Sequence, residues 1–256
     1  MKSMLFHTLM MLKSRFLDKS SLLKLTMTCA LSIGLIATSA HAAFVPGNQK
    51  PAPTTRRSDA GTTRGCSGGE LPLTILASRS YIGRSTAQQP TFAWFVPRDS
   101  ASKPMRFALY ERVPSGKPSL VREVTLQSSP GIMKLSSDIA LQAGKTYLWQ
   151  VIVQCDPDNP SGDLVSEGNI EIVAMPVDVK SKLDRARNGA ERVNIYAEAG
   201  LWYDAIAEAL KLAGTSKLGT VGSALINDLV QSEASGTPIK DAKQIATLKQ
   251  IATSER

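Results

Sequence analysis

One acidic, proline-containing loop of the sequence carries carboxylates at a spacing that could hold a calcium ion. Asp156, Asp158 and Glu167 occupy the first, third and twelfth positions of an EF-hand-like loop. The fifth position is Pro160, whose side chain offers no oxygen, and the sixth is Ser161 in place of the glycine that the sharp bend requires. Asp, Asn, Pro and Gly are also the residues that turns favour. We therefore predict a turn, with a weak calcium site as the alternative.

Two adjacent aromatic residues, Trp202 and Tyr203, are candidate contacts for a partner protein. They lie in a segment with helical periodicity, so both cannot face the core equally. We expect Tyr203 to be the more exposed of the two and therefore the better contact. A carbohydrate-binding role is an alternative, because aromatic rings stack on sugars. Trp94 and Trp149, however, alternate in step with apolar residues and are expected to lie in the core.

The N-terminus has the three-part pattern of a secretory signal. Four basic residues between positions 13 and 24 precede an apolar run over 25–36, and Ala40-His41-Ala42 is a small-x-small cleavage site. We predict a signal peptide over 1–42 and a mature chain that begins at Ala43. An uncleaved anchor is the alternative, but the apolar run is shorter than the ~20 residues that a bilayer span needs. We expect a periplasmic or extracellular protein.

The two histidines, His7 and His41, both lie in this predicted signal. The mature chain then lacks the residue on which Ser-His-Asp and Cys-His nucleophilic catalysis depend, and it lacks the commonest metal ligand. Carboxylate, Ser-Lys and Tyr mechanisms are chemically open, but no motif for them is found. We therefore predict a non-enzymatic protein with no catalytic residues and no cofactor, and we rank a carboxylate-based hydrolase last among its functions.

The cysteines indicate a structural crosslink. Of the three, Cys29 lies in the predicted signal, which leaves Cys66 and Cys155. In an exported chain two cysteines are expected to pair, so we predict a disulfide between them. A two-thiolate metal site is the alternative, but no third ligand of the right type lies nearby in the sequence. We expect no metal ion.

The net charge of +8 belongs mostly to the predicted signal. The chain has 30 basic and 22 acidic residues, and the signal holds five of the basic and one of the acidic, so the mature chain has a net charge of about +4. We therefore expect no nucleic-acid binding. Basic residues also lie in a Pro- and Thr-rich stretch over 43–64, which we interpret as a flexible linker. A weak contact of this linker with anionic envelope polymer is the alternative.

The region 65–176 reads as strands. Thr91–Val96 places Phe92, Trp94 and Val96 on one face between two prolines, and further strands are predicted near 106–111, 120–126, 144–155 and 168–175. In the run 144–155, Cys155 points the same way as Tyr147 and Trp149. Short strands separated by turn signals favour an antiparallel sandwich. The rhythm looks like that of fibronectin type III and immunoglobulin-like modules.

The region 177–256 reads as helices. The apolar spacing predicts one helix from about 183 to 197 that ends at Gly200, and a second over 202–213 that stops at Gly214. This hairpin resembles a single tetratricopeptide repeat, although such repeats usually stack. A third helix is predicted over 221–232, and a fourth begins at Thr237-Pro238. The expected fold class is therefore α+β and mainly β, a sandwich followed by a helical hairpin or small bundle.

An ordered set of short strings resembles a secreted cyanobacterial family described as domain of unknown function 928. The strings are RGCSG (64–68), PTFAWFVP (90–97), RFAL (106–109), PGI (130–132), GKTYLW (144–149), CDP (155–157) and GLWYDA (200–205). The resemblance covers nearly the whole mature chain and implies an exported sandwich-plus-helix protein of the cell envelope. It implies no activity or ligand. The chain departs from the family pattern at Ser223-Ala-Leu-Ile226, where a Trp followed by paired leucines is usual.

The leading hypothesis is therefore an envelope protein that binds another protein, which would be an envelope partner, through its helices. The second is a carbohydrate- or calcium-binding envelope module. An adaptor depends on its helices, whereas a sugar or calcium binder is stabilised by its ligand through mass action.

Overall fold

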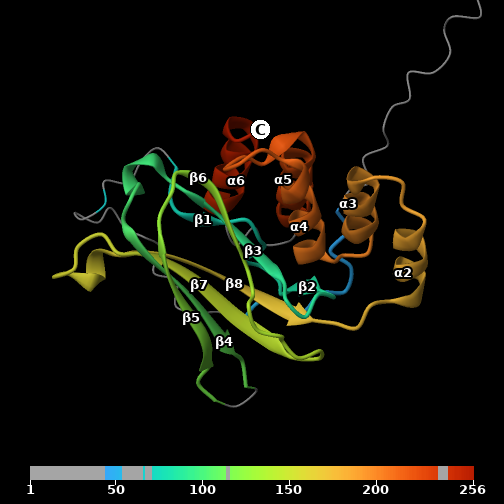
Figure 1. Cartoon of the computed structure of the whole chain (residues 1–256), viewed down its shortest axis with the longest axis horizontal. Coiled ribbons are helices and arrows are strands. Elements are labelled where there is room, and N and C mark those ends of the chain that lie inside the picture. Colours follow the sequence, from blue (N-terminus) through green and yellow to red (C-terminus); the bar gives the residue numbers. More distant parts are fainter. Residues whose placement is uncertain (1–43, 54–65, 67–70, 114–115, 236–241) are drawn as a thin grey trace, which may run out of the picture. The chain divides into compact units, whose positions relative to one another are not determined.

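The structure is a computed structural model that describes residues 44–53, 66, 71–113, 116–235 and 242–256. It has an α+β fold with two sheets and helices packed beside them (Figure 1). Within these ranges, none of the helices has the length and apolar content needed to cross a bilayer. The predicted signal peptide over 1–42, with its Ala40-His41-Ala42 site, lies outside the described residues, and so do residues 43 and 54–64 of the predicted linker.

The smaller sheet has three antiparallel strands in the order β1 (Thr74–Ile75), β3 (Thr91–Val96) and β6 (Gly131–Ser136). The bounds of β3 are those that the sequence predicts. Five of its six residues are buried, because side chains of the second sheet cover one face and α4 packs against the strand as well. A strand covered on both faces buries nearly every residue.

The larger sheet has five strands in the order β2 (Gly83–Ser85), β8 (Leu164–Ile172), β7 (Thr146–Val153), β4 (Pro104–Glu111) and β5 (Ser119–Gln127). The short β2 pairs with β8 in parallel, and the other pairs are antiparallel. Two 3₁₀ turns, Arg98–Ser100 and Pro160–Gly162, lie between strands. β8 begins and ends earlier than the strand that the sequence predicts over 168–175.

Aromatic side chains from both sheets and one helix meet in one core. Phe92 lies 5.0 Å from Phe107 and 5.1 Å from Trp149, measured between ring centroids. Tyr203 meets Phe92 edge-on at 6.0 Å. All four side chains are 2% exposed or less. Because tilted and edge-on rings attract each other beyond their burial, this cluster ties the helical part to both sheets.

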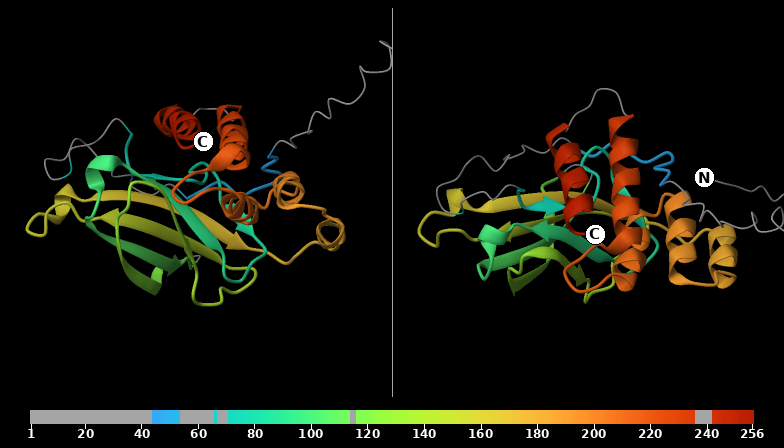
Figure 2. Two further views of the ribbon diagram at one scale, coloured as in Figure 1. Left: turned by 45° about the horizontal axis from the view of Figure 1, so that its top comes forward. Right: turned by 90° about the horizontal axis from the view of Figure 1, so that it is seen from above.

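Helices α2 (Val177–Asp184), α3 (Gly189–Glu198), α4 (Trp202–Leu212), α5 (Gly219–Ala234) and α6 (Ala242–Ser254) follow the last strand. α4 packs against β2 and β3, and α6 packs against β1, so these helices cover the side of the fold away from β4 and β5 (Figure 2). The bounds of α4 agree closely with the prediction. The expected start of the last helix at Thr237-Pro238 lies outside the described residues.

The single helix predicted over 183–197 is wrong, because the chain forms α2 and α3 with a break at 185–188. Asn188 caps α3, and its side-chain oxygen accepts the Glu191 amide at 2.9 Å. The Glu191 carboxylate reaches back to the Arg187 amide at 2.9 Å. These bonds satisfy amides that a continuous helix would have bonded internally, so they favour a new start.

The prediction of a flexible linker does not hold for residues 44–53, which pack on the core. Phe44 is 4% exposed, and its ring meets that of Trp202 edge-on at 5.0 Å. Pro51 forms a β-bridge with Tyr81, and Lys50 pairs with Glu171 at 2.6 Å. The segment therefore behaves as an extra extended element of the fold.

Candidate functional site

Both candidate partner contacts, Trp202 and Tyr203, are buried. Each side chain is 1% exposed, so the expectation that Tyr203 is the exposed member of the pair is wrong. The reason is that α4 lies between the sheets on one side and α5 with segment 44–53 on the other, so two of its faces are covered. Neither ring is available on the surface to a partner of the folded chain.

Tyr203 serves instead as a hydrogen-bonded link between α4 and the larger sheet. Its hydroxyl accepts the Trp149 indole N–H at 2.7 Å and donates to the Asn169 carbonyl at 3.0 Å. Burial raises the pKa of this hydroxyl above its ordinary value, and the bond from Trp149 acts in the opposite direction. The phenol therefore stays protonated, which makes it a structural donor rather than a base.

Asp204, the next residue, ties the start of α4 to the turn after β2. Its carboxylate accepts the Thr86 amide at 2.8 Å and the Thr86 hydroxyl at 3.2 Å. The side chain is buried, and burial raises the pKa of the carboxyl above its ordinary value although these hydrogen bonds lower it. A carboxyl with a raised pKa holds its proton more tightly in the folded chain than in the unfolded chain.

We therefore expect Asp204 to make the stability depend on pH. The folded chain binds more protons than the unfolded chain between the unfolded pKa, about 3.9, and the raised folded value, so stability is lost as pH rises through that window. The substitution Asp204→Asn keeps an oxygen for the Thr86 amide and removes the titration. Urea unfolding from acid to neutral pH should show the asparagine variant gaining on the wild type as pH rises. Parallel curves for the two chains would contradict this origin.

The acidic loop is a turn. The Asp156 carboxylate accepts the Asp158 amide at 3.0 Å, and the Asp156 backbone carbonyl accepts the Asn159 amide at 3.1 Å. Asp163 accepts the Cys155 amide at 3.1 Å, while Glu167 lies on β8 and accepts Gln150 at 2.7 Å. These bonds use the carboxylates to hold the local backbone. In the part of the chain that the structure describes, no three His, Cys, Asp or Glu side chains gather where they could hold a metal ion.

The predicted disulfide between Cys66 and Cys155 is present. The two Cα atoms lie 5.2 Å apart, and both residues are buried. Cys155 lies two residues beyond the end of β7, at Val153. The bond joins a residue that precedes the first strand to a residue just after β7, the central strand of the larger sheet, across 89 positions.

Exposed apolar side chains lie at the start of α2, which we define as the α2 corner: Met175 and Val177. These two side chains are 36% and 86% exposed. A further exposed apolar side chain, Leu212, ends α4 at 50% exposure and lies beside Gly189, where an added Cβ would come within 2.7 Å of it. The sequence analysis did not predict this surface. The signal for it is Pro176 followed by Val177, an apolar residue that does not share the helix face of Val179 and Leu183.

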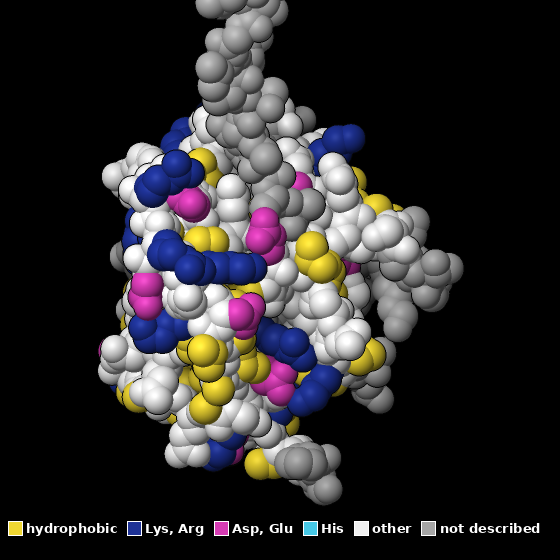
Figure 3. Space-filling model, turned by 90° about the vertical axis from the view of Figure 1, so that its right-hand side faces the viewer, with side chains coloured by type: hydrophobic (Ala, Val, Ile, Leu, Met, Phe, Trp, Pro, Cys, Tyr) yellow, Lys and Arg dark blue, Asp and Glu magenta, His cyan; other side chains and the backbone are white. Residues whose placement is uncertain are grey.

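Helix geometry explains why Val177 faces outward. Val179 and Leu183 are one turn apart and buried, so they form the inner face of α2. Val177 lies two residues before Val179, about 200° around the helix, and points away from that face. Figure 3 views the side where α2 and α3 lie and shows hydrophobic side chains among Lys, Arg, Asp and Glu.

The charges around the α2 corner are mixed with a basic excess. Segment 177–192 has five basic residues and three acidic residues, a net charge of +2. Two of the pairs are exposed i,i+4 contacts, Lys180 with Asp184 at 2.9 Å and Arg187 with Glu191 at 3.2 Å. Exposed pairs of this kind contribute little to stability, so these side chains can exchange partners at low cost.

The family model described as Domain of Unknown Function (DUF928) matches residues 59–235. Among solved structures, the chain is similar to the superoxide reductase (neelaredoxin) of Ignicoccus hospitalis and to two variants of it. The identity is 16–17%, the matches cover 41% of this chain and 80–81% of those chains, and the TM-score is 0.25. A likeness at this level says nothing about activity. No curated protein matches the chain significantly.

Proposed function

The chain belongs to the DUF928 family, whose description names no function. From the exposed side chains of this chain, we propose that it is a non-enzymatic, exported protein of the cell envelope that binds another protein through the α2 corner. The observation that carries this proposal is Val177, a large apolar side chain that is 86% exposed and lies two residues after Met175, which is 36% exposed. The large aromatic side chains of the core are buried, so an exposed apolar side chain such as Val177 is an exception in this fold.

The chemistry of the α2 corner specifies the kind of partner. A small apolar centre surrounded by polar side chains is the usual anatomy of a protein interface. The basic excess of segment 177–192 favours a partner with acidic groups around an apolar pocket. We propose an envelope protein with such a surface. The buried side of α2, through Val179 and Leu183, holds the corner in place before binding.

We further propose the finer architecture. Under this proposal, the two sheets form an immunoglobulin- or fibronectin III-like sandwich, which the shared aromatic core and the mostly antiparallel pairing support. Helices α3 and α4 form one tetratricopeptide-like hairpin, which the small buried residues Ala197, Ala205 and Ala209 support. The parallel pair of β2 and β8 is a feature of this chain that the sandwich comparison has to accommodate.

The alternative of a carbohydrate-binding module has less support. All three tryptophans are 1% exposed or less, so none presents a face on which a sugar ring could stack. The calcium version of this alternative would have to use the loop at Asp156, whose carboxylate already holds the turn.

A photo-crosslinking amino acid at position 177 tests the proposal. We expect an adduct with one protein in native envelope fractions, and we expect Val177→Asp to abolish recovery of that protein while leaving the melting temperature unchanged. The matched control places the same crosslinker at Leu120, which is apolar and 56% exposed but lies on β5. Equal adducts from the two positions, or none from position 177, would overturn the assignment of the α2 corner.

A further inference from the structure

An open groove lies between α5 and α6, at the end where α5 begins and α6 ends. The Leu218 amide donates to the Glu255 carbonyl at 2.7 Å and joins the two helices at this end. The groove has a volume of about 520 Å³, which is in the range of sites for small molecules. Its lining residues are short or polar: Thr220, Ser223, Ala224 and Asn227 of α5, Ala252 and Thr253 of α6, and Arg256 just after α6.

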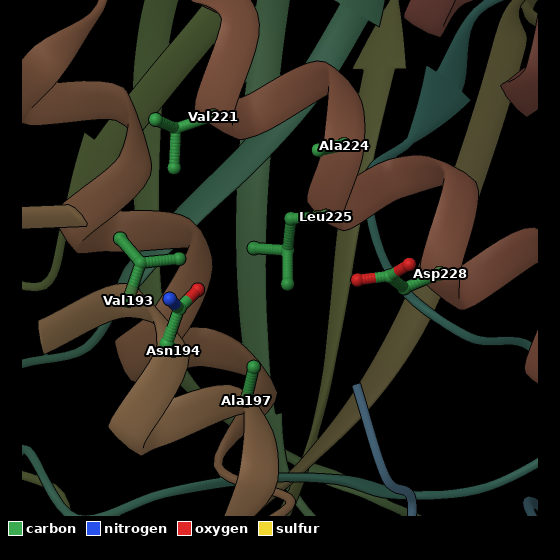
Figure 4. A pocket seen from close by; sticks show the side chains of 7 residues that line it. All are labelled: Val193, Asn194, Ala197, Val221, Ala224, Leu225 and Asp228. Carbon is green, nitrogen blue, oxygen red and sulfur yellow. The ribbon is translucent and has the colours of Figure 1, made fainter. Parts of the chain in front are cut away.

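The side of α5 that faces α3 holds a much smaller space. Figure 4 shows the side chains that line it, among them Val193 of α3 and Val221 and Leu225 of α5. Its volume is about 10 Å³, roughly what one water molecule needs. Branched apolar side chains fill this side, whereas the side toward α6 carries serine, threonine, asparagine and alanine. Of these two spaces, the groove between α5 and α6 is therefore the one with room for a ligand.

The floor of this groove contains a buried hydroxyl group. Ser223 is 4% exposed, and in the part of the chain that the structure describes its hydroxyl oxygen has no hydrogen-bond partner. Such a group destabilises the folded chain, and native proteins pair nearly all of their buried hydroxyls. The serine side chain has a single heavy-atom torsion, so a small rotation lets the oxygen meet a bound group. A ligand in the groove would therefore remove the cost of burying Ser223.

The rim of the groove is positively charged. Arg256 is exposed, and its guanidinium forms no ion pair with another described residue. Thr220 lies in the first turn of α5, which has no acidic residue, and the side chain of Leu218 caps no amide there. The positive end of the helix dipole is therefore not neutralised by these residues. The neighbouring acid, Glu255, pairs with Lys217 at 3.2 Å and does not line the groove. These charges favour an oxyanion.

We propose that the groove between α5 and α6 binds a small organic acid, whose carboxylate or phosphate pairs with Arg256 and whose polar groups bond to Ser223. The two oxyanions share the chemistry that a guanidinium recognises. Ala224 and Ala252 leave space for a short carbon skeleton between the helices. The site is separate from the α2 corner, so it adds a small-molecule ligand to the proposed protein partner.

Calorimetric titration of the purified protein with glycerol 3-phosphate, succinate and glycerol tests the proposal. We expect saturable binding of at least one of the two anions, and their relative affinities tell phosphate from carboxylate. Glycerol has the carbon skeleton of the first probe without its charge and should bind far more weakly. Arg256→Gln should weaken anion binding about tenfold, the effect of losing a charge-assisted hydrogen bond. The matched control Arg185→Gln removes the same charge from an exposed position after α2 and should leave the affinity unchanged. Absence of anion binding, equal binding of glycerol, or equal effects of the two arginine variants overturns the proposal.

The variant Ser223→Ala separates a ligand contact from a structural role. We expect it to weaken binding of the same anion several-fold and to leave the melting temperature of the ligand-free protein equal or higher, because the unpaired hydroxyl is gone. A lower melting temperature with unchanged affinity would assign the serine to folding and overturn its part in the site. Val177→Ala should not change the anion affinity, so the groove and the α2 corner are tested independently.

Discussion

Replacing Cys66 and Cys155 together by alanine is expected to lower the free energy of unfolding by about 3–4 kcal/mol. The disulfide closes a loop of 89 positions. On the chain-entropy model, a loop of this length destabilises the unfolded state by about 4.6 kcal/mol, and measured effects are usually about 2–4 kcal/mol. Alanine suits the two sites because both are buried among apolar groups. Guanidinium unfolding of the oxidised chain and the double variant measures the difference.

Reducing agent supplies the control for the disulfide prediction. Dithiothreitol should lower the stability of the wild-type chain toward that of the double variant and should leave the double variant unchanged. A double variant as stable as the oxidised wild type would show that the unfolded chain is already compact around these positions. In that case the loop-closure argument would fail.

The strand β3 was predictable from the prolines that bound it and from its apolar residue types, although it is buried on both faces. Thr91–Val96 lies between Pro90 and Pro97 and forms β3 with the expected bounds. The start of β8 was hidden because a polar residue, Ser166, occupies a core position at 1% exposure. There its hydroxyl accepts the Ile75 amide at 3.2 Å. Period-two reasoning treats serine as an outward residue, so it cannot find a buried hydroxyl that satisfies a neighbouring strand.

The candidate contacts were harder to predict for a reason of layering. Reasoning from a helical wheel assigns one buried face and one exposed face, and it therefore placed Tyr203 on the surface. The covering element on the second side of α4 includes Phe44, which lies 158 positions earlier in the chain than Trp202. The residues of α4 and its neighbours in the sequence do not indicate that contact. The break before α3 was local, by contrast, since Asn188 and Glu191 have the spacing of a capping box.

The substitution Trp202→Ala is expected to lower the free energy of unfolding by about 3–5 kcal/mol, the usual cost of removing a fully buried aromatic side chain. The ring is 1% exposed and meets Phe44 edge-on at 5.0 Å. Its indole N–H donates to the Leu76 carbonyl at 2.8 Å. The variant therefore loses contact with the N-terminal segment, leaves a cavity and orphans a buried carbonyl. Denaturant unfolding followed by far-UV circular dichroism measures the loss.

Two further variants separate these contributions. Trp202→Phe keeps most of the packing and removes the hydrogen bond, so it should cost about 1–3 kcal/mol, the penalty for an unsatisfied buried group. Val177→Ala shortens an apolar side chain that is 86% exposed and should change the stability by less than about 0.5 kcal/mol. If the alanine variant at 202 lost no more than the phenylalanine variant, then packing of Phe44 on Trp202 would not hold the N-terminal segment. Segment 44–53 would then be attached mainly through Lys50 with Glu171 and through its backbone bonds to Ser80 and Ile82.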